Sequence, residues 1–253
     1  HYYCNLNEQP EMNSFERITK KIFQNFGVLI RKYNPATSEE LRRIKLLQHY
    51  HIDLVFDIGA NKGQYAMGIM DAGYHNRIVS FEPLSEAHKV LKEGSRNYAN
   101  WTVAPRCAVG AKTEEIEMNI SANSVSSTLL TMLDSHLDGA PESKIIGKEK
   151  VMIYPLDEIA KEYIQTEKNI FLKIDVQGFE QEVLKGATQL IERAKGIEME
   201  ISLVSLYEGQ KWLLPEVLEF MQQKGFQLRS IMPAFTDHKT GNVLQCNGIF
   251  FRN

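Results

Sequence analysis

Two patterns of hydrophobic residues alternate along the central part of the chain. Short apolar runs that end on an acidic residue lie at residues 54–57, 77–82 and 170–175. Runs of this length are too short for most helices and are typical of buried strands. After the first run, apolar residues recur three or four positions apart, which predicts an amphipathic helix. Strands that alternate with helices indicate an α/β fold built on a mostly parallel sheet.

The middle of the chain departs from this alternation. Residues 115–120 and 150–155 alternate polar and apolar positions, as half-exposed strands do, so we expect them to pair as an antiparallel hairpin. The loop between them, residues 121–148, is rich in Ser, Asn, Gly and charged residues. Loops of this length are usually functional or disordered. We therefore expect its hydroxyl-rich start, residues 124–128, either to contact a substrate or to form a surface loop.

Three further strands are predicted towards the C-terminus. Residues 196–201 carry Glu198 and Glu200 on one face and are expected to lie beside the strand at 170–175. Residues 226–232 and 247–252 are expected to form a last antiparallel pair.

The N-terminal 50 residues predict two helices. Apolar residues from Phe15 to Tyr33 form one stripe, which is expected to end at Asn34-Pro35, and residues 37–40 are typical of a helix start. We expect residues 1–50 to form a helical extension packed on a domain of residues 51–253. The extension is also basic, so a membrane-surface or nucleic-acid role is the alternative. Residues 1–11 are either native or the remnant of a tag.

The chemistry of the chain is concentrated at the ends of the predicted strands. Asp57 precedes Gly59 and Gly63 in a strand–turn–helix, which brings backbone N–H groups to a small ligand. The spacing is G-x-x-x-G rather than the G-x-G-x-x-G of dinucleotide sites, and a carboxylate suits a cationic ligand group. Glu82 follows the second strand, where an acid accepts hydrogen bonds from ribose hydroxyls. A third strand at residues 107–110 is expected to end beside an adenine.

The second chemical element is L-K-I-D-V-Q-G-F-E at residues 172–180. Lys173 and Asp175 are two positions apart, so both side chains leave the same face of the strand. In parallel register with the next strand, Glu198 could approach Lys173 and Glu200 could approach Asp175. A buried lysine needs such a partner, because an unpaired buried charge is costly.

Together with D-I-G-A-N-K-G-Q-Y and S-F-E-P, this element resembles the FkbM family of methyltransferases over roughly residues 54–235. The resemblance implies a class I, Rossmann-like methyltransferase fold: a doubly wound, mostly parallel seven-stranded sheet with an antiparallel last strand, here with an extra β-hairpin and the N-terminal helical extension. It implies S-adenosylmethionine as methyl donor and a hydroxyl oxygen as the usual acceptor, in a small molecule or glycan such as a sugar, glycolipid or secondary metabolite. The residues expected to bind the cofactor are Asp57, Gly59, Asn61, Gly63, Tyr65, Glu82, Pro83, Ala108, Val109 and Asp175. Those expected to act in the reaction are Asp175, Lys173, Glu180 and Glu200.

Composition narrows this hypothesis without replacing it. The 253 residues suffice for one large α/β domain with an appendage, and a net charge of −3 argues against general nucleic-acid binding. Three scattered cysteines favour a reducing compartment, and no apolar run approaches the ~18 residues of a membrane span, so we expect a cytoplasmic protein without stable membrane insertion.

Several alternatives remain open at this stage. An NAD(P)-dependent oxidoreductase shares the strand–turn–helix, and a binding module could keep the cofactor pocket without turnover. Asp175, Glu180 and Glu200 could bind a divalent metal such as Mg²⁺ as easily as act as bases. The sequence leaves the oligomeric state open.

Overall fold

The computed structural model describes residues 14–122, 128, 130, 133 and 143–253. The chain divides into two units, residues 1–42 and residues 43–253. The division falls before the boundary that we predicted between residues 50 and 51. The reason is that Ile44 and Leu47 of helix α2 (Glu39–His49) are buried in the core of the larger unit.

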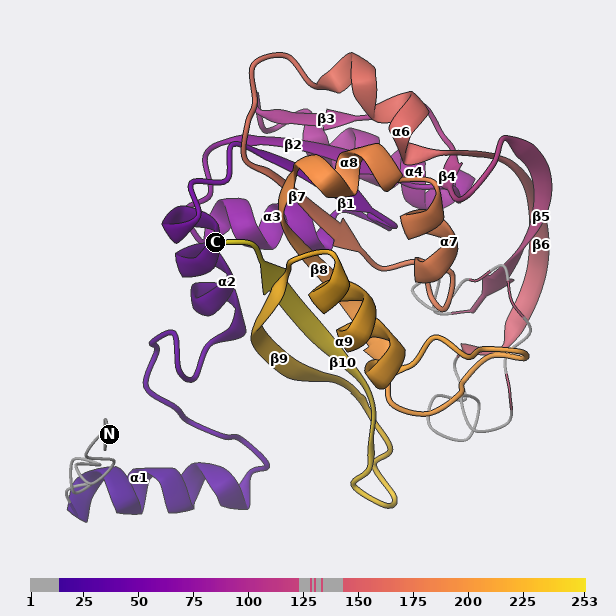
Figure 1. The fold of residues 1–253 in the computed structure, drawn as a ribbon. Coiled ribbons are helices and arrows are strands. Elements are labelled where there is room, and N and C mark those ends of the chain that lie inside the picture. The colour runs from indigo at the N-terminus through magenta and orange to yellow at the C-terminus, as the bar shows by residue number, and fades with distance from the viewer. Residues whose placement is uncertain (1–13, 123–127, 129, 131–132, 134–142) are drawn as a thin grey trace. The chain divides into compact units, whose positions relative to one another are not determined.

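The larger unit is built on a seven-stranded sheet in the order β3-β2-β1-β7-β8-β10-β9 (Figure 1). Strand β10 runs antiparallel to both of its neighbours, and the pairings from β3 to β8 are parallel. The predicted doubly wound sheet with one antiparallel strand near its end is therefore confirmed. Its strands are β1 (Leu54–Ile58), β2 (Arg77–Phe81), β3 (Trp101–Val103), β7 (Ile170–Ile174), β8 (Ala194–Ser202), β9 (Gln227–Thr236) and β10 (Val243–Phe251).

Helices cover both faces of this sheet. One apolar core lies between the sheet and α6 (Leu156–Ile159), α7 (Glu180–Lys185), α8 (Thr188–Arg193) and α9 (Leu214–Gln223). The other core lies between the sheet and α2, α3 (Gln64–Asp71) and α4 (Ser85–Ser95). A short 3₁₀ helix, η2, follows α6 at Ala160–Tyr163.

Alternation along the strands assigns the charged residues to one of these faces. Leu54 and Phe56 enter the α6–α9 core, so Asp57 points to the α2–α4 face with Val55. Lys173 shares that face with Phe171. This face of the sheet is thus apolar at one end and charged at the carboxyl ends of the strands.

A second, three-stranded sheet has the order β4-β6-β5. Strands β5 (Glu114–Ser121) and β6 (Ile145–Tyr154) pair antiparallel, which confirms the predicted hairpin, and β4 (Ala108–Val109) adds to β6 in parallel. Most of the loop between β5 and β6, including residues 124–127 of its hydroxyl-rich start, lies outside the described residues.

The first helix of the smaller unit is shorter than we predicted. Helix α1 (Ser14–Asn25) ends well before Tyr33 because Gly27 adopts a left-handed φ of 71° and Val28 N–H donates to the carbonyl of Phe23. This is the geometry of a glycine-terminated helix. Ser38 caps α2 as expected, because its Oγ accepts a hydrogen bond from Leu41 N–H at 3.2 Å.

The apolar stripe of α1 is exposed. Phe15, Ile18 and Ile22 are 77%, 60% and 51% exposed. In the parts of the chain described by the structure, we find no helix with both the length and the apolar character to cross a membrane.

Candidate cofactor and catalytic site

Two cavities open at the carboxyl ends of the central strands. The first is mostly apolar, with Phe81, Val109 and Phe179 in its wall. The second is lined by polar residues that include Tyr65, Lys173, Glu198 and Glu200. Gly59, Asn61 and Asp175 line both cavities. The loop after β1 and the end of β7 therefore form the point where an apolar and a charged compartment meet.

The loop after β1 needs glycine for a steric reason. Gly59 has φ of 79°, and a Cβ added there would lie 1.9 Å from the backbone oxygen of Asp175. Only a residue without a side chain lets the two strand ends approach so closely. Gly63, at the start of α3, has φ of 92° and packs in the same way against Trp101. The glycines of the motif thus bring the cavity walls together.

Asn61 presents an unpaired polar atom at this junction. It too is left-handed, with φ of 48°, and its N–H donates to Glu82 Oε2 at 2.7 Å. Its side-chain oxygen Oδ1 is buried and has no hydrogen-bond partner among the described residues. A buried oxygen without a partner at a cavity wall is suited to a ligand N–H or O–H.

Glu82 holds the loop while facing the first cavity. It accepts hydrogen bonds from Asn61 N–H and from Leu84 N–H at 2.8 Å. Burial raises the pKa of Glu82 to about 7, although both N–H groups oppose the shift. Each carboxylate oxygen keeps a second lone pair, so the residue can still accept hydrogen bonds from a ligand.

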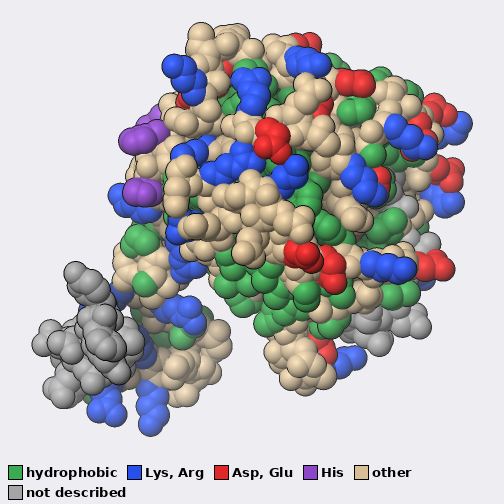
Figure 2. Space-filling model, in the orientation of Figure 1, with side chains coloured by type: hydrophobic (Ala, Val, Ile, Leu, Met, Phe, Trp, Pro, Cys, Tyr) green, Lys and Arg blue, Asp and Glu red, His purple; other side chains and the backbone are tan. Residues whose placement is uncertain are grey.

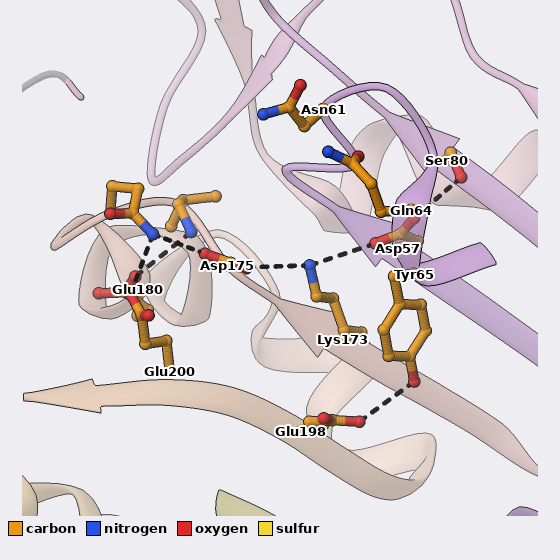
Figure 3. Close-up of polar contacts among 12 residues, drawn as sticks. Asp57, Asn61, Gln64, Tyr65, Ser80, Lys173, Asp175, Glu180, Glu198 and Glu200 are labelled. Carbon is orange, nitrogen blue, oxygen red and sulfur yellow. Dashed lines mark hydrogen bonds and ion pairs between the residues drawn. The ribbon is translucent and has the colours of Figure 1, made fainter. Parts of the chain in front are cut away.

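Asp57, Lys173 and Asp175 form a chain of charges across β1 and β7 (Figure 3). Lys173 Nζ lies 3.5 Å from Asp57 Oδ1 and 3.2 Å from Asp175 Oδ2. Burial alone would lower the pKa of Lys173, but the two carboxylates outweigh it and raise that pKa. Lys173 is therefore a cation that holds the carboxylates, and it does not lose a proton in the neutral range.

The two carboxylates differ in access. Asp57 is fully buried, accepts a hydrogen bond from Ser80 Oγ at 3.2 Å and is part of neither cavity wall. Burial raises its pKa, against the effect of Lys173. The Asp175 side chain is 35% exposed and faces both cavities. The end of β7 therefore offers the accessible carboxylate, while Asp57 lies behind Lys173.

Glu198 has a partner other than the one we expected. The parallel register does place Glu198 beside Lys173, but the carboxylate binds the guanidinium of Arg43 from α2 at 2.6–3.0 Å. Tyr65 also donates to Glu198, at 3.2 Å, and its ring lies under Lys173 and Arg43. The predicted register of Lys173 with Glu198 is thus confirmed, but the ion pair of Glu198 is formed with Arg43.

Glu180 supports the turn after β7. Its carboxylate accepts hydrogen bonds from the N–H groups of Val176 and Gly178 at 3.3 and 3.1 Å, and the residue is buried. Burial raises its pKa to about 7 despite these donors. The wall of neither cavity includes Glu180. Its contacts shape the loop that carries Asp175.

Gln177 connects Asp175 with Glu200. Its side-chain amide donates to Asp175 Oδ1 at 2.8 Å and to Glu200 Oε2 at 3.0 Å, while its oxygen accepts from Tyr207 at 3.1 Å. Gln245 adds a second donor to Glu200, at 2.8 Å. Burial and the neighbouring Asp175 raise the pKa of Glu200 well above its usual value. The expected approach of Glu200 to Asp175 is therefore made through an amide.

The predicted site residues fall into three groups. The first cavity is lined by seven of the predicted cofactor residues: Gly59, Asn61, Glu82, Pro83, Ala108, Val109 and Asp175. Tyr65, Lys173 and Glu200 line the second cavity, and Asp57, Gly63 and Glu180 support the walls from behind. Sequence reasoning missed Arg43, Gln177 and Asn247. Arg43 and Asn247 lie far from any motif, whereas Gln177 stands inside L-K-I-D-V-Q-G-F-E and could have been considered.

Over the residues described, no group of three or more His, Cys, Asp or Glu side chains is placed to hold a metal ion.

Comparison with known families identifies the class of protein. A family model described as the methyltransferase FkbM domain matches residues 57–228, which is more than half of the chain. The chain belongs to the FkbM family of methyltransferases, whose methyl donor is S-adenosylmethionine. This decides for a methyltransferase over an oxidoreductase. A search of curated proteins found no match.

Solved structures with similar folds come from several bacteria. Methyltransferase FkbM from Methylobacillus flagellatus KT is 14% identical, with a TM-score of 0.48 over 95% of this chain and 71% of that chain. Precorrin-6y C5,15-methyltransferase from Geobacter metallireducens is 11% identical, with a TM-score of 0.43 over 89% and 93%. A TehB-like SAM-dependent methyltransferase from Corynebacterium glutamicum is 12% identical, with a TM-score of 0.43 over 94% and 97%.

Proposed function

We propose that the chain transfers a methyl group from S-adenosylmethionine to a hydroxyl oxygen of a small molecule or glycan, such as a sugar, glycolipid or secondary metabolite. The observation that carries the proposal is the position of Asp175. Its carboxylate is accessible where the apolar cavity meets the charged cavity. A group that removes a proton from an acceptor has to stand at such a junction.

The residues present suit S-adenosylmethionine. An adenosyl group is flat and largely apolar, and the first cavity offers an apolar wall with Glu82 at its edge for ribose hydroxyls. In the second cavity, Lys173 offers a cation to the carboxylate of the amino-acid end, and the oxygens of Glu200 can accept hydrogen bonds from its ammonium group. At the junction, Asn61 Oδ1, which has no partner among the described residues, can accept a hydrogen bond from the ligand. Asp57 acts from behind, by holding Lys173.

When bound, S-adenosylmethionine supplies an electrophilic methyl group on a sulfonium sulfur. Asp175 accepts the proton of the acceptor hydroxyl, so that the oxygen is a better nucleophile. Lys173 and Gln177 each donate to one oxygen of Asp175, at 3.2 and 2.8 Å, which fixes the orientation of the carboxylate. Each oxygen retains a lone pair for the incoming proton.

The test separates cofactor binding from the reaction. Asp175→Asn keeps the shape of the side chain and removes its basicity. Calorimetry with S-adenosylhomocysteine should give nearly wild-type affinity, whereas the rate of methyl transfer should fall by about 10²–10⁴. Transfer is followed with methyl-labelled S-adenosylmethionine and a panel of sugars, glycolipids and phenols, and mass spectrometry locates the new methyl group.

Glu180→Gln is the matched control, because it changes a buried carboxylate outside both cavities. It should leave the rate of methyl transfer near the wild-type value. Labelled product on carbon or nitrogen, or label found in RNA or protein, would contradict O-methylation of a small acceptor. Full activity in Asp175→Asn would show that another group removes the proton.

A further inference from the structure

Helix α1 has two chemically distinct sides. Phe15, Ile18 and Ile22 recur at three- and four-residue spacing and lie on one side, because the helix has 3.6 residues per turn. Arg17 lies on the opposite side, and Lys21 lies at the border of the apolar side, one turn after Ile18. The apolar side is exposed, as are both basic residues. Such a helix normally buries its apolar side against another surface.

The same character continues after the helix ends. Phe26, Val28, Leu29 and Tyr33 are exposed large hydrophobic residues of the following segment. Arg31 and Lys32 add two positive charges there. Residues 14–33 thus form a continuous apolar and basic strip, which we call the N-terminal strip.

Charge is concentrated in this strip against the trend of the chain. Residues 14–33 contain five Lys and Arg and a single acidic residue, whereas the whole chain contains 29 Lys and Arg against 32 Asp and Glu. Figure 2 shows Lys and Arg side chains, in blue, gathered on the N-terminal unit. A covering surface must therefore be apolar in part and negatively charged.

We propose that the N-terminal strip binds the surface of an anionic lipid bilayer. Helices with an apolar side rich in Phe and Ile and a polar side rich in Lys and Arg lie in the interface, with the apolar side at the acyl boundary. The basic side chains then face the anionic headgroups. The 12 residues of α1 are fewer than the ~20 needed to cross the hydrocarbon, so the helix lies along the surface.

The composition of the strip favours lipid over other partners. Nucleic acid would satisfy the charges but leave Phe15, Ile18 and Ile22 uncovered. The same strip of a second copy of the chain would cover the apolar side but would gather like charges. A surface with both an anionic and an apolar layer satisfies the two sides at once.

Sedimentation of the full chain with vesicles tests the proposal. Wild-type protein should sediment with vesicles of phosphatidylcholine mixed with phosphatidylglycerol and stay in solution with phosphatidylcholine alone. Arg17→Glu with Lys21→Glu should weaken partitioning by at least about thirtyfold, because each Lys or Arg lost near an anionic surface removes about fivefold and each added Glu is repelled by it. Ile18→Ser with Ile22→Ser should weaken it by about tenfold or more. The matched control is Lys89→Glu with Lys92→Glu on the exposed side of α4, which changes the net charge equally and should sediment as wild type.

A second readout does not depend on loss of binding. Phe15→Trp places an indole on the apolar side, and its emission should shift to the blue with the anionic vesicles only. The proposal would be overturned if, at low salt, the emission of Phe15→Trp did not shift with anionic vesicles and wild-type protein did not sediment with them. Nucleic acid would be the partner if Arg17→Glu with Lys21→Glu abolished oligonucleotide binding while none of the proteins bound vesicles. A second copy of the chain would be the partner if Ile18→Ser with Ile22→Ser dissociated an oligomer and left vesicle binding unchanged. Either result would overturn the proposal. A deficit in the α4 control equal to that of the strip variants would assign binding to another surface.

Discussion

Replacing Gln177 should show how the carboxylates of the site are kept together. Its amide nitrogen donates to both Asp175 and Glu200, and its backbone is left-handed, with φ of 54°. Gln177→Met keeps the length of the side chain and removes both donors. Gln177→Glu keeps the shape, removes the same donors and adds a third carboxylate between two others.

The magnitudes follow from these contacts. A hydrogen bond to a charged group contributes about 1.5–3 kcal/mol, so losing two should lower the free energy of unfolding of Gln177→Met by roughly 3 kcal/mol. Gln177→Glu should lose at least about 1 kcal/mol more near neutral pH, because like charges a few ångströms apart repel in a buried site. The folded state raises the pKa of the introduced acid above its unfolded value. The extra loss is therefore absent below the unfolded pKa and grows as the pH rises towards the folded pKa.

Urea unfolding followed by the fluorescence of Trp101 and Trp212 measures both effects. The free energies of the two variants should converge at acid pH and separate towards neutral pH. Gln48→Glu, on the exposed side of α2, adds the same charge without carboxylate neighbours at the site and should match wild type within about 0.5 kcal/mol. Equal stabilities for Gln177→Met and Gln177→Glu at every pH would refute the reasoning.

Other residues give simpler tests. In thermal unfolding, Gly59→Ala should lower stability by about 2 kcal/mol more than Gly73→Ala. Both substitutions place alanine at a left-handed φ, but only the Cβ at position 59 would clash with a backbone oxygen. Burial raises the pKa of Glu180 from 4.5 to about 7, so the free energy of unfolding decreases as the pH rises between these values. In urea titrations, Glu180→Gln should reduce the slope of this decrease by up to about 1.4 kcal/mol per pH unit. Arg43→Met should cost about 3–5 kcal/mol by leaving a buried carboxylate unpaired, and adding Glu198→Met should recover most of it in the same assay.

Local patterns predicted the strands and many of the residues that line the first cavity. The run before Asp57 and the run around Lys173 form neighbouring strands, because short apolar runs that end on an acid and a glycine leave few other arrangements. The register Lys173–Glu198 was also predictable, since parallel strands align their carboxyl ends. Residues at the ends of such strands line the cavity for the same topological reason.

Partner choice and helix ends were less predictable. Register brings Glu198 beside Lys173, but it says nothing of a guanidinium from a helix 155 positions earlier that offers a bidentate contact. The apolar spacing from Phe15 to Tyr33 continues beyond the helix, so the spacing does not predict that the helix ends before Gly27. In both cases the deciding feature is a contact or a backbone angle that hydrophobic spacing does not encode.

The pairing of Arg43 changes where the methyltransferase unit begins. The family match starts at residue 57, yet Glu198 within it is buried and binds a cation that lies outside it. Ile44 and Leu47 anchor the same helix in the core, so the contact is fixed by packing as well as by charge. A buried carboxylate without that cation would be strongly destabilising. Arg43 is therefore part of the wall of the charged cavity, and the compact unit that contains the family match begins at residue 43.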